Sequence, residues 1–215
     1  MNWSRNVTIK KVTEKEILKI FKDEKALLSG HFLLSSGLHS PNYMQCALLL
    51  QKPPLAETLC RALAKKISLK IDVVIGPALG GMIVAHEMGR ALKARSVFAE
   101  RVPASPAGGD GNFVLRRGFE LRKNEKVLVV EDVVTTGKST REVMAIAEEK
   151  GAEVAGVAAL VDRSDGAAVF LHDFYSLLKI HIPVYKPGDC PLCRAGKAAL
   201  TKPGSRGLKT EGERS

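Results

Sequence analysis

The chain has 215 residues, 45% of them hydrophobic, which is enough to bury one core and too few for two large domains. No stretch approaches the roughly 18 consecutive apolar residues of a membrane-spanning helix, and the amino terminus lacks the apolar run of a signal peptide, so we expect a soluble cytoplasmic protein with no membrane partner. The formal net charge of +10 suits anionic partners, but much of it falls after Arg194, in a tail, which argues against a nucleic-acid partner.

The first elements are a helix and a hairpin. Thr13 and Glu16 form a capping-box pattern, and apolar residues at near-helical spacing predict a helix over 14–29, ended by Ser29-Gly30. Short apolar runs on either side of a Ser/Gly turn then predict two strands within 31–43.

A strand, turn and helix unit follows a packing helix. Pro53 begins that helix, whose leucines recur every four residues. The run 72–75 predicts a buried strand, and 76–81 is a glycine-rich turn that opens onto a helix over 82–92. Glycines let the backbone approach a ligand closely, and a helix amino terminus attracts anions, so this turn is a candidate anion site.

The next strand, 96–101, leads into a long excursion of low hydrophobicity over 102–112. A loop of that length inside a compact domain is either functional or disordered. A short apolar run begins at Phe113, directly after this loop.

The most informative stretch is 126–140. Val127 to Val130 predict a strand buried on both faces of a parallel sheet, and Glu131 and Asp132 stand at its carboxyl end, where ligands of open α/β sheets bind. A turn rich in Thr, Gly and Ser then leads into a helix over 139–150. Its amides and the hydroxyls of Thr135, Thr136, Ser139 and Thr140 suit a phosphate. Because carboxylates repel phosphate, we expect them to serve hydroxyl groups, a metal or a developing cation on the ligand. A phosphorylated ribose, with a phosphate at one end and hydroxyls near the reacting carbon, fits both halves.

A nucleotide-binding P-loop is the competing interpretation of Gly137-Lys138-Ser139. That motif requires a glycine five residues before Gly137, and this chain has Asp132 there. A plain strand with a capped helix is the simplest alternative, but two acids beside several hydroxyl groups exceed what capping needs.

The remaining elements complete an alternating pattern. A buried strand over 153–161 ends at Asp162-Arg163, 175–182 predicts an edge strand, 188–206 is rich in turns, and residues 207–215 form a tail that we expect to be disordered. The alternation predicts an α/β fold with a central parallel sheet flanked by helices and right-handed crossovers.

Four cysteines are present, and two of them form the pattern Cys190-x-x-Cys193. A closed zinc site needs four ligands, and the nearest histidines along the chain, His172 and His181, do not have the usual spacing. We therefore expect reduced, structural thiols, with metal binding or redox chemistry as the alternatives.

The motif from Glu131 to Ser139 resembles the phosphoribosyl-diphosphate signature of type I phosphoribosyltransferases, and residues 14–206 resemble the orotate phosphoribosyltransferase branch. The resemblance implies one domain over 1–206, with a hood from about 1–50 and 165–206 over a core of about 51–165. It implies transfer of ribose 5-phosphate from phosphoribosyl diphosphate to orotate, with Mg²⁺ carried by the diphosphate rather than by protein side chains. It assigns catalysis to Glu131, Asp132 and Arg101. It assigns binding of phosphoribosyl diphosphate to the same three residues together with Val133, Val134, Thr135, Thr136, Gly137, Lys138, Ser139, Gly80 and Gly81.

The resemblance also implies an orotate site and a dimer. Orotate would contact Thr135, Arg163, Ser36 and Tyr43, and the loop 102–112 would reach across a homodimer interface. Two departures from the family pattern stand out: Ser35 occupies a position that is basic in many relatives, and the loop lacks their lysine and histidine. Arg116 and Arg117 are candidates to supply the missing charge.

Two other functions stay open at this stage. One is a regulatory protein that binds phosphoribosyl diphosphate and RNA, which the thinned loop favours and the tail location of the charge opposes. The other is transfer to a different base, because few residues determine base identity.

Overall fold

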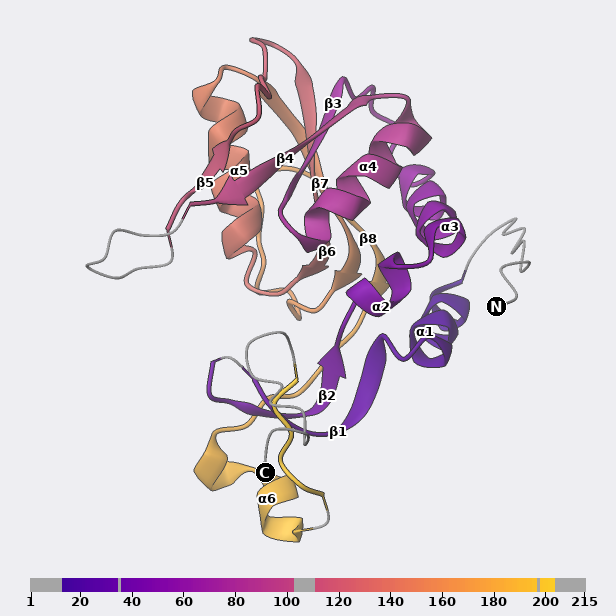
Figure 1. Ribbon diagram of the computed structural model, residues 1–215, viewed down its shortest axis with the longest axis vertical. Coiled ribbons are helices and arrows are strands. Elements are labelled where there is room, and N and C mark those ends of the chain that lie inside the picture. Colours follow the sequence, from indigo (N-terminus) through magenta and orange to yellow (C-terminus); the bar gives the residue numbers. More distant parts are fainter. Residues whose placement is uncertain (1–12, 35, 103–110, 197, 204–215) are drawn as a thin grey trace, which may run out of the picture.

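The computed structural model describes residues 13–34, 36–102, 111–196 and 198–203. A main body contains a six-stranded sheet, and a smaller lobe projects from one end of it (Figure 1). The strand order is β5-β4-β3-β6-β7-β8, with every neighbouring pair parallel except β4 and β5. The predicted α/β class with a central parallel sheet is confirmed.

Among the described residues, a helix separates β3 from β4 and β6 from β7, whereas β4, β5 and β6 follow one another without a helix, as do β7 and β8. The strands of the main sheet are β3 (Val73–Pro77), β4 (Arg95–Arg101), β5 (Phe113–Leu115), β6 (Lys126–Val134), β7 (Glu153–Asp162) and β8 (Phe174–Lys179). The helices are α1 (Glu14–Asp23), α2 (Ala47–Leu50), α3 (Pro53–Ala64), α4 (Gly80–Leu92), α5 (Lys138–Glu149) and α6 (Pro191–Ala195), and a short 3-10 turn, η1, spans Pro187–Asp189.

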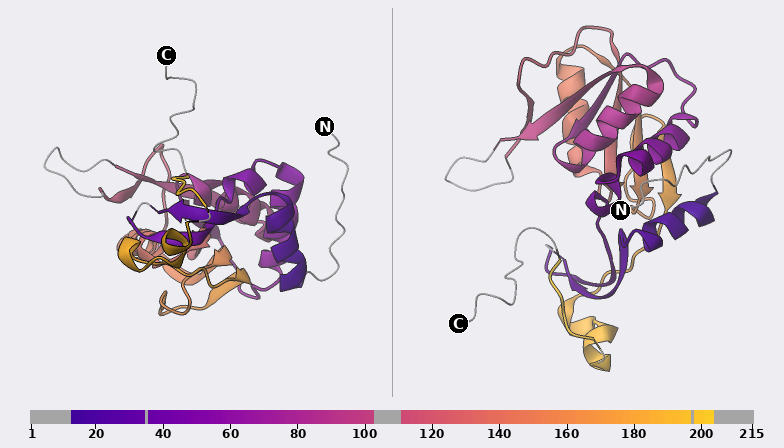
Figure 2. Two further views of the ribbon diagram at one scale, coloured as in Figure 1. Left: turned by 90° about the horizontal axis from the view of Figure 1, so that it is seen from below. Right: turned by 45° about the vertical axis from the view of Figure 1, so that its right-hand side comes forward.

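The predicted central strand is the middle of β6, between β3 and β7. Val127 to Val130 are completely buried, because helices cover both faces of the sheet there. Helices α1, α3 and α4 pack with Leu128 and Val130 on one face, and α5 packs with Val127 and Val129 on the other. Figure 2 shows this layered arrangement from two further directions.

The predicted helix over 14–29 is too long. The capping box of Thr13 and Glu16 does begin α1, but the helix ends at Asp23, and Lys25 has a positive φ of 56°. Ile17 and Phe21 anchor α1 in the main core, whereas Leu27 pairs with Met44 in a strand. The apolar spacing continued across a boundary between two elements, so Ser29 and Gly30 lie within strand β1 rather than at a helix end.

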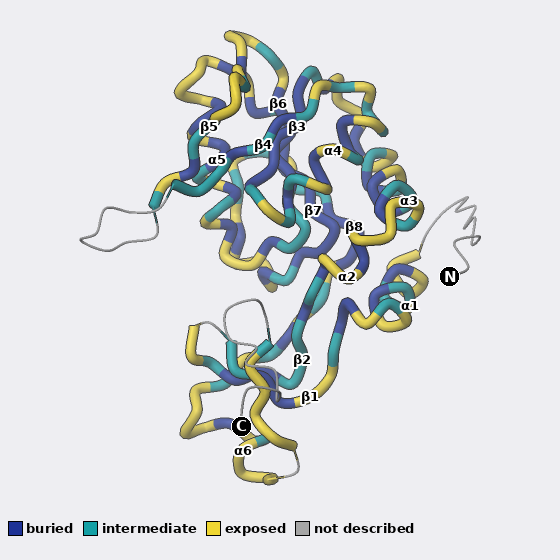
Figure 3. The backbone as a smooth tube through the Cα atoms, viewed as in Figure 1, coloured by how far each residue is buried: buried dark blue, intermediate teal, exposed yellow. Residues whose placement is uncertain are grey.

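The smaller lobe, called the hood below, consists of residues 27–44 and the described part of 183–203. Strands β1 (Leu27–Leu33) and β2 (His39–Met44) form its antiparallel ribbon, as the sequence predicted. The carboxyl-terminal segment returns to this ribbon through Thr201, beside Phe32, and Tyr185, beside His39. Much of the hood is exposed or half-buried, whereas the centre of the main body is buried (Figure 3).

Three elements within the predicted hood ranges belong to the main body. Helices α1 and α2 pack in the main core, and β8 is an edge strand of the main sheet. The residues after 206 and the centre of the 102–112 loop lie outside the described residues. Within the described residues, no helix combines the length and the apolar character needed to cross a membrane.

Candidate functional site

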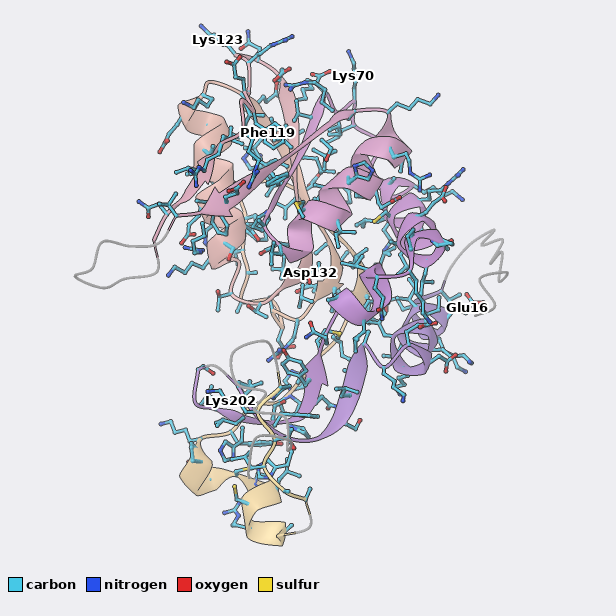
Figure 4. The ribbon with its side chains drawn as sticks, in the orientation of Figure 1. Glu16, Lys70, Phe119, Lys123, Asp132 and Lys202 are labelled. Atoms are coloured by element: carbon cyan, nitrogen blue, oxygen red, sulfur yellow. The ribbon has the colours of Figure 1, made fainter. Side chains whose placement is uncertain are left out.

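The predicted site residues gather at one edge of the main sheet. Four adjacent parallel strands, β4, β3, β6 and β7, end there, so their following loops lie side by side. These loops carry Arg101, the 76–81 turn, the 131–139 stretch and Arg163. Asp132 lies at the end of the body nearest the hood, while Lys123 lies at the opposite end (Figure 4).

The acidic pair is largely buried although it lies at a strand end. Burial raises the pKa of Glu131 to about 7, with help from the negative charges of Asp132 and Glu142 and against the effect of a hydrogen bond from Thr140. Burial also raises the pKa of Asp132, which backbone amides at Asp132 and Val133 partly offset. Two carboxyls with raised pKa values at a loop-lined edge are typical of a binding or catalytic site.

The glycine-rich turn after β3 lies directly against Asp132. A Cβ added at Gly80 would lie 2.6 Å from the Asp132 carboxylate oxygen, so only glycine allows this approach. At Gly81 a Cβ would meet the Pro77 ring at 2.7 Å. The peptide bond between Ala78 and Leu79 is cis. The turn therefore lies against the Asp132 side chain, and ligand binding by Gly80 and Gly81 stays a prediction.

The loop after β6 turns sharply into α5. Gly137 has a positive φ of 71° at the helix N-cap, which provides no side-chain cap for the first amides. Thr135 and Thr136 are exposed, and Thr136 accepts a hydrogen bond from the Lys138 amide at 3.3 Å. Val133 and Val134 complete β6 as it leaves the core. Uncapped amides beside exposed hydroxyls suit an anion.

Thr140 has a different role from the one expected. It was counted among the hydroxyls that face a phosphate, but its side chain is fully buried and its hydroxyl donates a hydrogen bond to Glu131. The correction follows from helical geometry, because residue 140 faces the sheet while the residues before it face outward. Thr140 therefore acts on the carboxylate.

Arg101 ends β4 beside α5. Its guanidinium donates to the Glu142 carboxylate at 2.7 Å and to the Gly111 carbonyl at 2.6 Å, and it lies 4.1 Å from the centre of the Phe113 ring. These contacts orient Arg101 at the point where the 102–112 loop leaves the sheet. Arg117 pairs instead with Glu100.

The predicted orotate residues come from both lobes. Arg163 follows β7, its amide donates to the Val134 carbonyl at 2.8 Å, and burial lowers the pKa of its half-buried guanidinium. Tyr43 lies on β2, in the hood. Ser36 is exposed in the hairpin turn, and Ser35 lies outside the described residues. The Asp162 carboxylate accepts hydrogen bonds from the Ser164 amide and hydroxyl.

Sequence patterns did not identify two supporting side chains. Glu142 holds Arg101, and Arg141 donates to the Thr136 carbonyl at 2.5 Å while its guanidinium lies 5.7 Å from the centre of the Phe170 ring. Both occupy the first turns of α5, directly after the recognised motif. Their charge at that position was the available signal, but surface charge on a helix is too common to identify a role.

The known proteins with similar sequences and structures that follow are phosphoribosyltransferases. The family model described as phosphoribosyl transferase domain matches residues 49–191. The orotate phosphoribosyltransferase of Carboxydothermus hydrogenoformans is 52% identical over 194 residues, covering 89% of this chain and 97% of the relative. That of Caldicellulosiruptor saccharolyticus is 50% identical over 193 residues, covering 89% and 97%. The crystal structure of orotate phosphoribosyltransferase from Aeropyrum pernix matches with a TM-score of 0.61 and 27% identity, over 76% of this chain and 93% of that one.

Proposed function

Because this chain belongs to the phosphoribosyltransferase family, in its orotate phosphoribosyltransferase branch, we propose how its site performs the transfer. The enzyme is a pentosyltransferase that moves ribose 5-phosphate from phosphoribosyl diphosphate to orotate, giving orotidine 5-phosphate and pyrophosphate. One observation supports the residue assignments most: a half-buried acidic pair and an uncapped helix amino terminus share one edge of the sheet.

We assign the two halves of phosphoribosyl diphosphate to these two features. The amides and hydroxyls of Thr135 to Ser139, with the cation of Lys138, bind the 5-phosphate, because amides at a helix amino terminus and hydroxyl groups donate hydrogen bonds to anions. Glu131 and Asp132, at the end of β6, accept hydrogen bonds from the ribose hydroxyls. The pyrophosphate then extends towards Gly80 and Gly81, where the absence of side chains leaves backbone exposed to it.

The acidic pair also suits the reacting carbon. As the bond to pyrophosphate breaks, positive charge develops on the ribose ring, and a fixed negative charge close by stabilises that state. Asp132 is held by backbone amides and by its contact with Gly80, so it needs no rearrangement to do this. Arg101, oriented by Glu142, is placed to neutralise the departing pyrophosphate.

Magnesium is part of the proposal. Mg²⁺ takes oxygen ligands and keeps several waters, and on a diphosphate it would neutralise charge on the leaving group. The edge offers carboxylate oxygens of Glu131 and Asp132, which fit such an ion as direct or water-mediated ligands. We propose that the diphosphate itself carries the ion and that these carboxylates approach it with the ribose.

Base recognition would involve both lobes. Orotate carries a carboxylate and ring carbonyl oxygens, which match the two-pronged donor geometry of the Arg163 guanidinium. Tyr43 and Ser36 lie in the hood and Thr135 lies at the sheet edge, so hydroxyl groups from both lobes are available to the base. The hood would then cover the base while the sheet edge holds the sugar.

Three further parts of the account are proposals. We propose one domain over 1–206, with the hood as a lid on the core, and a cytoplasmic enzyme. We also propose a homodimer in which the 102–112 loop of each chain reaches the partner's site, which sedimentation in solution would test. A monomer at micromolar concentration with full activity would contradict a shared site.

An activity assay tests the proposed function directly. Purified protein with Mg²⁺ should consume orotate, followed by its ultraviolet absorbance, only when phosphoribosyl diphosphate is added. Uracil, adenine and guanine serve as competing bases. Consumption of a purine in preference to orotate would contradict the assignment.

A further inference from the structure

A cluster of metal-ligand side chains lies in the hood, away from the sheet edge. Its members are His31 of β1, His39 of β2, and Cys190 and Cys193 at the start of α6. Their four ligand atoms all lie within 4.8 Å of one another. His172 and His181, the nearest histidines along the chain, are not part of this cluster. The two histidines beside the thiols are instead His31 and His39, in the hairpin about 150 residues earlier.

The distances between these atoms match a tetrahedral site. His31 Nε2 lies 3.1 Å from His39 Nδ1 and 3.6 Å from each of the two sulfurs, and Cys193 Sγ lies 3.2 Å from His39 Nδ1. Around one ion with bonds of about 2.0 Å to nitrogen and 2.3 Å to sulfur, tetrahedral angles require separations of about 3.3 Å between nitrogens and about 3.5 Å between nitrogen and sulfur. The four distances given above, with all four atoms within 4.8 Å of one another, therefore fit the ligands of one ion.

The ligand types select the metal. Two thiolates and two imidazoles in tetrahedral array are the donor set of structural zinc, and four protein ligands leave no open position for catalysis. His31, His39 and Cys190 are buried, and Cys193 lies at the surface of the cluster. The other ring nitrogen of His31 lies 3.2 Å from the Ala198 carbonyl oxygen, a contact that fixes its orientation as second partners of zinc-bound histidines do.

The hood has a structural need for such an ion. Among the described hood residues, only Leu27 and Met44, where the ribbon joins the main body, belong to a hydrophobic core cluster, although Phe32 and Cys190 are individually buried. The two chain segments are also joined by backbone hydrogen bonds at Thr201 and Tyr185 and by a hydrogen bond from the Ser40 hydroxyl to the Pro183 carbonyl at 3.0 Å. Small lobes without an apolar core commonly depend on a metal or disulfide for stability.

We propose that His31, His39, Cys190 and Cys193 bind one Zn²⁺ that fastens the carboxyl-terminal segment to the β1–β2 ribbon. Binding releases the two thiol protons to solvent, and each imidazole binds through its unprotonated nitrogen, so no oxidant or reductant takes part. The ion is structural, and its role in the reaction is to hold the ribbon that carries Ser36 and Tyr43. The zinc site is independent of the proposed function, because zinc content can be measured without either substrate.

Metal analysis of the full-length protein tests the site. The protein is purified under reducing conditions without a metal-affinity step, equilibrated with zinc, and passed into metal-free buffer. We expect about one zinc per chain, and X-ray absorption with two sulfur and two nitrogen ligands at about 2.3 and 2.0 Å. Less than about one-fifth of a zinc per chain, or an oxygen-dominated shell, would overturn the proposal.

Matched variants locate the ion. Cys193→Ser changes the exposed ligand and should reduce bound zinc at least about tenfold, as should His39→Asn. Cys60→Ala and His86→Ala change a thiol and an imidazole outside the cluster and should keep the metal. Equal zinc content in the ligand variants and the controls would overturn the proposal. If the ligand variants do not fold, the ligand shell of the wild-type protein decides the question.

Two further measurements separate zinc from its alternative. A strong chelator should lower the melting temperature of the wild-type protein, and added zinc should restore it. If Cys190 and Cys193 instead form a disulfide in the purified protein, thiol titration would find two fewer free thiols and the zinc content would be low. That result would contradict the proposal.

Discussion

Glu131 at the end of β6 accepts a hydrogen bond from the buried hydroxyl of Thr140, one turn into α5. The contact joins the two halves of the proposed site, because α5 begins with the amides that we assign to the 5-phosphate. It also lowers the pKa of a carboxyl that burial raises to about 7. The charge of Glu131 therefore depends on pH near neutrality.

The first prediction concerns pH and ligand affinity. We expect the affinity for phosphoribosyl diphosphate to rise as pH increases through about 7, because only the ionised Glu131 accepts hydrogen bonds from both ribose hydroxyls. Thr140→Val should move this transition to higher pH. Calorimetric titration from pH 5.5 to 8.5 measures the affinity at each pH. Glu131→Gln is the control, because the ligand's own phosphates titrate in the same way with either protein. An identical pH profile in Glu131→Gln would contradict the prediction.

The same carboxyl should influence stability. Its pKa in the folded protein lies above the ordinary value of 4.5, so its contribution to the unfolding free energy is fully present below about 4.5 and is lost as pH rises through about 7. Glu131→Gln should therefore lose less stability than the wild-type protein between pH 5 and 8. Urea unfolding at the two pH values measures the difference. An equal loss in the two proteins would mean that Glu131 is already ionised at pH 5 and would contradict the prediction.

Gly80 tests the contact between the turn and the acidic pair. Gly80→Ala places a methyl group within 2.6 Å of the Asp132 carboxylate, and relieving such overlap typically costs 1–3 kcal/mol. We expect binding of phosphoribosyl diphosphate to weaken at least about tenfold. Gly188→Ala, where no atom lies within 4 Å of the added carbon, is the matched control. Wild-type affinity in Gly80→Ala would show that the turn tolerates displacement.

Much of the fold could be predicted from sequence because local patterns and packing agree in the main body. The buried strand at Val127 to Val130 and the helix beginning at Pro53 are confirmed by β6 and α3. The prediction failed at residues 24–29, where apolar spacing alone does not distinguish the end of a helix from the start of a strand. The positive φ of Lys25, which separates α1 from β1, has no glycine to signal it.

The candidate site followed from one motif, but its supporting contacts did not. Glu131 and Asp132 could be placed because parallel strands bring their carboxyl ends to one edge. The pairing of Arg101 with Glu142 and the histidines beside Cys190 depend on tertiary contacts between distant segments. The spacing of residues along the sequence does not predict such contacts.

Arg163 is predicted to select orotate. Arg163→Lys keeps the charge but loses the paired donors, and a charge-assisted hydrogen bond contributes about 1.5–3 kcal/mol. We expect the KM for orotate to rise at least about tenfold while the affinity for phosphoribosyl diphosphate stays near the wild-type value. Arg61→Lys, on the exposed side of α3, controls for the substitution. If KM for orotate is unchanged, another residue recognises the base carboxylate.

Arg101 is predicted to act on the leaving group. Arg101→Gln should reduce kcat at least about tenfold, because the developing charge on pyrophosphate loses its neighbouring cation. Arg117→Gln removes a cation that pairs with Glu100 and should change kcat little. Steady-state kinetics with both substrates saturating compares the two. A larger loss of kcat in Arg117→Gln than in Arg101→Gln would mean that Arg117, which follows β5, neutralises the pyrophosphate instead.

The most direct test of the account is calorimetric titration of the wild-type protein and Asp132→Asn with magnesium phosphoribosyl diphosphate. The account predicts one binding event per chain in the wild-type protein, at least about tenfold weaker binding in the variant, and a fall in turnover of at least about tenfold, because the fixed negative charge beside the ribose is gone. Asp173→Asn, an exposed aspartate, should behave as the wild-type protein. Wild-type affinity and near-wild-type turnover in Asp132→Asn would contradict the claim that the acidic pair after β6 holds the ribose.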